Sequence, residues 1–270
     1  MSVHADSFLR VLADIEDSLT ASHIAAFPVW CCKSDHDSER LHQEIAPGGQ
    51  RDYHHVPVRD EDGHIRTVVY RDDLGGKRGP ARKNGRLIGV DHKFEASRPL
   101  LDAIVRLKNT GFLLVTSLES GQPDGVSGII NHADLQKLPV RLLLFARLSE
   151  LEATLREIVT GSDWLIRGDC SNERKYAEGE RQRHNKGEED LPLEQYLNLK
   201  GLVAVAQRLN RFVPQERAIE DRLTSLRAVR NHIAHGLEFG NGDTPSPEET
   251  VKAVQDAFAI VEWAIRSVVS

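Results

Sequence analysis

The first half of the chain repeats one order of structural elements, and this repetition limits its fold more than any other feature of the sequence. The first copy spans about residues 19–75 and opens with the apolar run AAFPVWCC at 25–32, followed by a polar stretch with the character of a helix. A strand, a turn at Asp62-Gly63, a second strand and an acidic helix start complete it, because apolar runs bounded by turn residues are typical of strands. The predicted order is strand, helix, strand, strand, helix.

The second copy spans about residues 85–137 and shows the same order. It begins with LIGV at 87–90, which we predict to be a strand, and continues into a helix over 98–111 that Gly111 closes. A strand, a glycine-rich turn, another strand and a helix start with an aspartate follow. Two βαββα repeats therefore account for residues 1–138, and we expect an α+β fold there.

The ends of both copies resemble CBS repeats. The stretches HIRTVVYRDDL and VSGIINHADL are similar to the last strand and the helix start of that repeat. Paired CBS repeats form a Bateman module, which in that family commonly binds adenine nucleotides between its two halves. The resemblance covers about residues 19–137, and it implies an adenine nucleotide as a regulatory ligand.

The resemblance makes Asp73 and Asp134 the candidate contacts to the ribose of a nucleotide. Tyr70 and Asn131 stand three residues before them, where the family often has serine or threonine. A carboxylate at a helix start can accept hydrogen bonds from ribose hydroxyls, and a helix N-terminus favours phosphate. The same aspartates are good N-caps, so a merely structural role stays open.

Residues 139–270 contain no convincing strand, and Pro139 marks the expected boundary between two domains. A charged insert at about 167–191 is expected to be a mobile loop or a solvated extension of a helix. Its basic residues could contact RNA, but acidic residues are interleaved with them, which favours solvation. Amphipathic stretches around the insert predict an all-α bundle of four helices: 140–159, 191–212, 215–235 and 246–269.

The third of these helices carries an unusual polar strip, RAVRNHIAHG at 227–236. Asn231 and His235 are one turn apart and share a face, whereas Arg230 points about 140° away from His235. Such a strip can be a solvated face or a helix-end network, where Arg and His complement the helix dipole. A regular apolar stripe runs beside it: Ile219, Leu223, Leu226, Val229 and Ile233.

The strip also resembles the Arg-X4–6-His motif of HEPN-domain ribonucleases, best known as RN-x-x-x-H. Arg230, Asn231 and His235 match it, near the end of the third helix and before a loop and a last helix. The resemblance covers about residues 139–270 and implies a HEPN-like bundle with endoribonuclease activity. One HEPN subfamily has a tyrosine two residues after the histidine. Leu237 stands at that position, so the chemistry of that subfamily is not expected.

The three matched side chains suit RNA cleavage in which the 2′-hydroxyl is the internal nucleophile. His235 can transfer protons near neutral pH, and Arg230 can stabilise charge on two phosphate oxygens. Asn231 can hold the imidazole or a non-bridging oxygen. His232 is a second candidate for a direct role in the reaction. The helix has no array of metal ligands, so we predict neither a catalytic metal nor a cofactor for catalysis.

Two glutamates on the first helix of the bundle, Glu150 and Glu152, could form ion pairs at the surface or support the motif. Either could form a surface ion pair with Arg147 or Arg156. Alternatively one of them turns inward to fix Arg230. We favour the surface for both.

The divergence of Arg230 and His235 on one helix favours a site that a second chain completes. HEPN nucleases resemble one another in using a dimer whose two motifs line one cleft. This resemblance implies a homodimer and an RNA substrate.

Charge and composition limit the setting. The formal net charge of −6 argues against a protein that coats nucleic acid generally, because neutralising phosphates needs clustered Lys and Arg. No stretch approaches about 18 consecutive apolar residues, and the N-terminus lacks the pattern of a signal peptide. Three cysteines, with Cys31 and Cys32 adjacent, form no disulfide framework or zinc spacing. We expect a cytoplasmic protein with no membrane partner.

These observations lead to the hypothesis that a CBS pair senses a nucleotide and controls a dimeric HEPN ribonuclease, as would suit a stress-response or phage-defence effector. One alternative is a non-catalytic HEPN and CBS assembly protein, in which the motif is structural or binds RNA. Another is an enzyme with a different regulator, in which the CBS pair serves only for dimerisation.

Overall fold

The computed structural model describes residues 13–15, 17–46, 53–184, 191–213, 219–235 and 247–268. They belong to two compact units. The α+β unit comprises the described residues of Leu19–Pro139, and the helical unit comprises the described residues from Val140 onwards and those before Leu19. Among the described helices, none is both long and apolar enough to cross a membrane.

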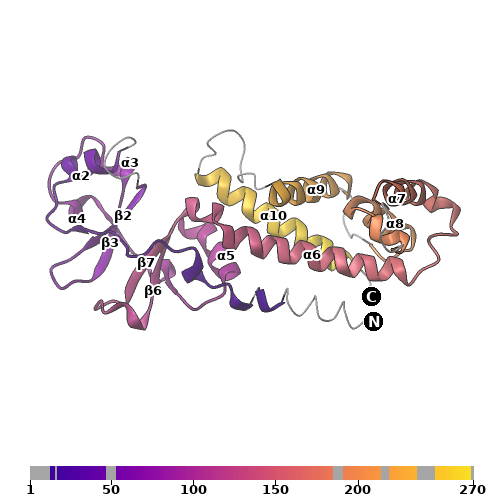
Figure 1. Ribbon diagram of the computed structural model, residues 1–270. Coiled ribbons are helices and arrows are strands. Elements are labelled where there is room, and N and C mark those ends of the chain that lie inside the picture. Colours follow the sequence, from indigo (N-terminus) through magenta and orange to yellow (C-terminus); the bar gives the residue numbers. More distant parts are fainter. Residues whose placement is uncertain are drawn as a thin grey trace. The chain divides into compact units, whose positions relative to one another are not determined.

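The first repeat of the α+β unit is built around a four-stranded sheet (Figure 1). Its elements are β1 (Cys32–Lys33), α2 (Ser38–Ile45), β2 (His55–Arg59), β3 (Ile65–Tyr70), α3 (Arg71–Leu74), α4 (Ala81–Asn84) and β4 (Arg86–Leu87). The strands lie in the order β1-β2-β3-β4, with β1 parallel to β2 and the other pairs antiparallel. The carboxylate of Asp37 caps α2 by accepting hydrogen bonds from the amides of Glu39 and Arg40.

The second repeat has a three-stranded sheet of the same design. Its elements are η2 (Val90–His92), β5 (Lys93–Glu95), α5 (Leu100–Thr110), β6 (Leu113–Thr116), η3 (Leu118–Ser120), β7 (Val126–Ile130) and η4 (His132–Gln136). β5 is parallel to β6, and β6 is antiparallel to β7. Gly111 ends α5 in the left-handed conformation, at φ 76°, as the sequence predicted. The prediction of an α+β fold with two repeats is confirmed, although the closing helix of the second repeat is a 3-10 helix.

The strand expected at residues 87–90 is wrong in its position and its partner. Arg86–Leu87 pairs with β3 and so completes the first sheet, while β5 at Lys93–Glu95 takes the place of that strand in the second repeat. The backbone passes close to β3 just before this pairing. A Cβ at Gly85 would lie only 2.3 Å from Cγ2 of Thr67, so glycine is required there.

The segment before β1 pairs in turn with the sheet of the second repeat. Within the apolar run 25–32, the amide of Ala26 donates to the carbonyl of Ile129 at 2.8 Å, and the amide of Val29 donates to Ser127 at 3.0 Å. Both acceptors belong to β7. Each sheet is therefore completed by the segment that precedes the other repeat, and this is why so little of the apolar run forms β1.

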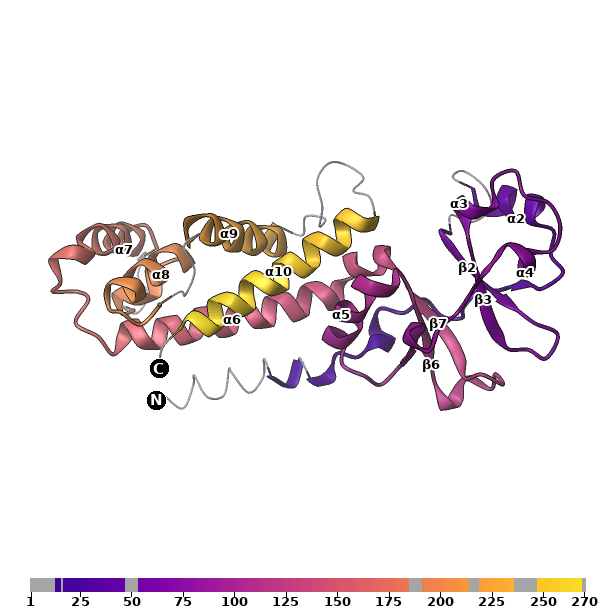
Figure 2. The ribbon, with the colours of Figure 1, turned by 180° about the vertical axis from the view of Figure 1, so that it is seen from behind.

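The helical unit contains only helices and connecting loops among its described elements, apart from one isolated bridge between Phe212 and Val268. Its elements are α6 (Leu138–Thr160), η5 (Gly168–Cys170), α7 (Ser171–His184), η6 (Leu193–Tyr196), α8 (Leu199–Arg208), α9 (Ile219–His235) and α10 (Pro247–Ser267). α9 lies between α10 and α8, and α8 also contacts α7 (Figures 1 and 2). The prediction of a helical second half is confirmed.

The charged insert differs from its expected form. Residues 171–184 form the helix α7, and its Ala177 is completely buried, so a loop throughout is wrong. The helix is held by ion pairs as well. Glu173 contacts Arg208 of α8 at 2.6 Å. Residues 185–190 of the insert lie outside the described chain.

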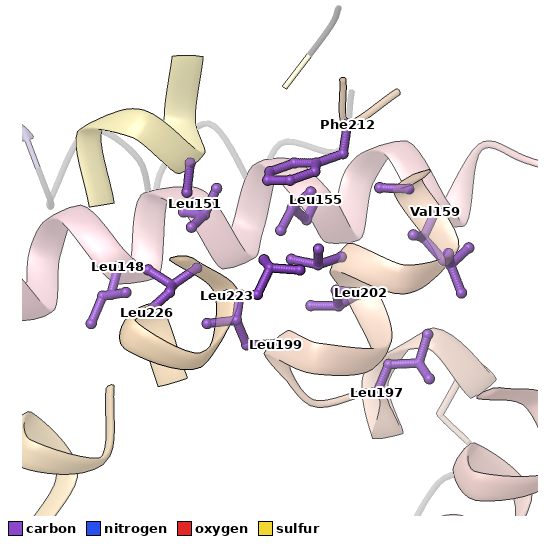
Figure 3. Close-up of a cluster of buried hydrophobic side chains, with 14 of the residues drawn as sticks. Leu148, Leu151, Leu155, Val159, Leu197, Leu199, Leu202, Phe212, Leu223 and Leu226 are labelled. Atoms are coloured by element: carbon purple, nitrogen blue, oxygen red, sulfur yellow. The ribbon is translucent and has the colours of Figure 1, made fainter. Parts of the chain in front are cut away.

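Leucine is the commonest residue in the core of the helical unit, and its leucine side chains point towards one another (Figure 3). α6 supplies one apolar stripe at helical spacing, and α8, α9 and α10 supply most of the facing side chains. Burying each leucine contributes about 2 kcal/mol in transfer free energy. The labelled members of this core are Leu148, Leu151, Leu155, Val159, Leu197, Leu199, Leu202, Phe212, Leu223 and Leu226.

Candidate functional sites

The polar strip of α9 lies beside a packed apolar stripe, as its spacing predicted. Leu223 and Leu226 are buried, and Val229 and Ile233 pack against the same core. Of the predicted stripe, only the side chain of Ile219 lies outside the described chain. The helix is therefore anchored by its apolar face, and the described side chains of Arg230 and Asn231 lie outside that face.

The matched motif is partly described. The side chains of Arg230 and Asn231 are both exposed to solvent. His235 is the last residue of α9, but its side chain, like that of His232, lies outside the described part. The guanidinium and the amide are therefore open to solvent, and the position of the imidazole stays a prediction.

The glutamates of α6 face charged neighbours within the helical unit. Glu150 lies 3.2 Å from Arg147, which also approaches Glu262 of α10 at 3.8 Å. Arg156 donates to the backbone carbonyls of Glu194 and Leu197. Arg147 thus connects α6 with α10, and Arg156 connects α6 with η6.

The candidate ribose contact of the first repeat, Asp73, lies in the first turn of α3 and is held by an arginine. Its Oδ2 accepts a hydrogen bond from Nε of Arg86 at 2.8 Å and lies in an ion pair 2.7 Å from Nη2 of the same guanidinium. The same guanidinium lies 4.3 Å above the ring of Tyr70. Tyr70, Asp73 and Arg86 therefore form one cluster, and the Asp73 side chain retains 27% exposure within it.

The corresponding aspartate of the second repeat, Asp134, is occupied inside the protein. Its Oδ2 accepts the amide of Asn131 at 2.7 Å, and its Oδ1 contacts Nζ of Lys137 at 2.7 Å. Asn131 returns the contact by capping η4 through Ala133. Burial raises the pKa of the Asp134 carboxyl above its usual value, whereas Lys137 and the amide act in the opposite direction. With 8% of its side chain exposed, Asp134 serves as a helix cap.

An aromatic and imidazole cluster also lies between the two repeats. No motif in the sequence indicates it. The ring centroid of Phe112 lies 5.1 Å from that of His55 and 4.6 Å from that of His92, and Tyr70 meets His55 edge-on at 4.8 Å. Burial lowers the pKa of His55 to about 4, and the neighbouring imidazoles, with His132 foremost, act in the same direction. The signal in the sequence was a histidine beside a strand end in each repeat: His55 at the start of β2 and His92 directly before β5.

Metal ligation finds no support in the part of the chain that the structure describes. No group of three or more His, Cys, Asp or Glu side chains there is arranged to hold a metal ion. The three cysteines are free thiols, and two of them, Cys32 and Cys170, are buried.

No model of a known protein family matches the sequence, and no curated protein matches it. Solved CBS structures match part of the chain. A CBS domain from a membrane protein of Sphaerobacter thermophilus is 16% identical and covers 51% of this chain and 98% of its own, with a TM-score of 0.37. The CBS domain pair of protein MJ0100, solved with 5-methylthioadenosine and S-adenosyl-L-methionine, is 13% identical over 44% of this chain and 94% of its own, at 0.37. CBSX2 in complex with AMP is 14% identical over 49% and 98%, at 0.36.

At identities and TM-scores this low, the likeness by itself assigns neither a ligand nor an activity to this chain. The geometry of the chain defines its class: two α+β repeats whose sheets each pair with the segment that precedes the other repeat, followed by a helical unit in which Arg230 and Asn231 are exposed.

Proposed function

We propose that the α+β unit is a sensor for an adenine nucleotide and that it binds the ribose at Asp73. The observation that carries this proposal is a partly exposed carboxylate beside the ring of Tyr70, at the position that the resemblance to CBS repeats assigns to ribose. A carboxylate can accept hydrogen bonds from both hydroxyls of a ribose. Asp134 is not proposed as an equal partner, because internal groups already use both of its oxygens.

We propose that the helical unit is a metal-independent endoribonuclease whose site contains Arg230, Asn231 and His235. Exposure of the first two residues on an otherwise well-packed helix supports the proposal. A guanidinium on the surface can donate two parallel hydrogen bonds to the phosphate at the cleaved bond, and an imidazole can take the proton of the 2′-hydroxyl. The nucleotide would control this activity by binding one arrangement of the protein better than another.

We propose that the working enzyme is a homodimer. On an α-helix, Arg230 and His235 point about 140° apart, so one chain presents them to one phosphate poorly. Two α9 helices from two chains would place the arginine of one beside the histidine of the other. Mixing Arg230→Ala chains with His235→Ala chains tests this arrangement, because partial activity returns only when the site is shared.

The nuclease proposal is tested with purified protein and RNA in EDTA. Wild type should cleave, and Arg230→Ala and His235→Ala should lose activity by about 100-fold or more. Arg266→Ala is the matched control, because Arg266 is an exposed arginine on the neighbouring helix α10. Equal cleavage by all four proteins would point to the non-catalytic alternative, in which the motif binds RNA or is structural.

The sensor proposal is tested by calorimetry with AMP, ATP and S-adenosylmethionine. Binding to the wild type and its loss in Asp73→Asn would support the site. Heat from none of the three ligands would remove the nucleotide from the proposal. Adding a ligand that binds to the RNA assay then shows whether it raises or lowers cleavage.

A further inference from the structure

The proposed ribose contact is already occupied by a side chain of the same chain. Nε of Arg86 donates a hydrogen bond to one oxygen of Asp73, Nη2 forms an ion pair with the same oxygen, and the guanidinium also lies over the ring of Tyr70. Arg86 thus covers the ring and the carboxylate at the same time. A ligand that brings a diol to Asp73 competes with this guanidinium for the same oxygen.

The energy of that exchange depends on what the ligand offers to Arg86 in return. A neutral nucleoside takes the carboxylate and leaves the guanidinium without its ionic partner. A ligand with a positive centre, such as a sulfonium, adds repulsion. A ligand with a phosphate gives the guanidinium a new anion that it can bind through two parallel hydrogen bonds.

Arg86 is free to make such a move. Its side chain is 62% exposed, and it stands on the two-residue edge strand β4, which follows Gly85. Its backbone pairing with Val68 does not involve the guanidinium. The side chain can therefore leave Asp73 while β4 stays in the sheet.

We infer that Arg86 is a specificity-determining residue that makes the site of the first repeat select phosphorylated ribonucleotides over nucleosides and sulfonium-containing analogues. The inference rests on the nucleotide-binding role proposed above for Asp73. It assigns Arg86 two partners: Asp73 in the free protein and the ligand phosphate in the complex.

Calorimetry on the full chain with AMP, adenosine and S-adenosylmethionine tests the inference. Wild type should bind AMP at least about tenfold more tightly than adenosine, because charge-assisted hydrogen bonds of this kind are strong. Arg86→Gln should weaken AMP binding and strengthen adenosine binding, since the carboxylate is then free, so that the two affinities come within about threefold. Arg86→Lys should keep part of the preference, because it keeps the charge without the fork.

Arg98 provides a matched control in the other repeat. It pairs with Asp102 at 2.9 Å and lies 5.0 Å above the ring of Phe94, so Arg98→Gln removes the same type of cluster elsewhere. This variant should keep the wild-type preference for AMP.

The outcomes separate the inference from the proposed function. An AMP-to-adenosine ratio that is unchanged in Arg86→Gln overturns the inference alone, as does an equal loss of both ligands in that variant. Binding of none of the ligands by wild type or Arg86→Gln overturns the nucleotide sensor, and this inference with it.

Discussion

The rings of His55 and Phe112 lie 5.1 Å apart between centroids, and the two residues stand at the same place in the two repeats. His55 opens β2, and Phe112 directly precedes β6, the strand with the same role in the second repeat. The pair therefore marks where the two sheets of the α+β unit meet. Phe112 is fully buried and His55 can ionise, so we expect the contact to depend on pH.

Acid should weaken the α+β unit through His55. Burial lowers the pKa of this imidazole from 6.5 to about 4, so the unfolded chain binds the proton at higher pH than the folded chain does. The stabilisation is therefore complete above about pH 6.5, is lost as the pH falls towards 4, and amounts to at most about 3 kcal/mol. Hydrogen exchange of the amides of β2 and β6 as a function of pH measures it.

The variant His55→Phe should show a shallower pH dependence than wild type over this range. His54→Phe, which changes the exposed neighbouring imidazole, should keep most of the wild-type slope, because burial and His132 lower the pKa of His55 more than His54 does. A slope that is the same in all three proteins would show that other groups cause the acid sensitivity.

Replacing Asp134 should destabilise the protein more than replacing Asp73. Asp134→Ala removes a buried cap and the partner of Lys137, and we expect a loss of about 1–3 kcal/mol. Asp73→Ala removes an ion pair with an exposed arginine, and we expect less than about 1 kcal/mol. Hydrogen exchange of β7 and β3 reports on the two repeats. Equal losses would show that Asp73 is also a structural residue.

On α9, a substitution in the core should lower stability, whereas a substitution in the exposed motif should not. Leu226→Ala opens a cavity in the core of the helical unit, and we expect a loss of about 2–4 kcal/mol in urea unfolding. Arg230→Ala removes an exposed side chain and should change stability by less than about 0.5 kcal/mol. A large destabilisation by Arg230→Ala would mean that loss of activity in this variant reflects folding.

Arg156 should hold η6 against α6. Arg156→Met keeps the length of the side chain but loses the donors to the carbonyls of Glu194 and Leu197, which should cost about 1–3 kcal/mol. Limited proteolysis should then cut near 193–197 faster than in wild type. Arg183→Met, which removes only an exposed contact to Glu180, should be cut at the wild-type rate.

The sequence predicted those elements whose pattern is local. The strand alternation and turn residues predicted both repeats, the stripe of α9 predicted its buried face, and Gly111 predicted the end of α5. The partner of β4 could not be predicted in this way. Arg86 and Leu87 are both exposed, so no apolar pattern indicates which sheet they join.

Polar contacts between distant segments were equally hidden. Composition predicted that the charged insert stays solvated, but the ion pair from Glu173 to Arg208 brings α7 against α8. The resemblance to CBS repeats suggested two equivalent sites, at Asp73 and Asp134. Only the folded structure distinguishes them, because Lys137 and Arg86 engage them in different surroundings.

The exchange of edge segments has a consequence for how this chain can be assembled and reused. During synthesis the first sheet lacks its last strand until Arg86 has left the ribosome, and the segment at Ala26 waits for β7 to be made. A single repeat expressed alone would leave β3 or β7 as an open edge, which invites pairing with other chains. The smallest piece of the α+β unit that can be transplanted into another protein is therefore the pair.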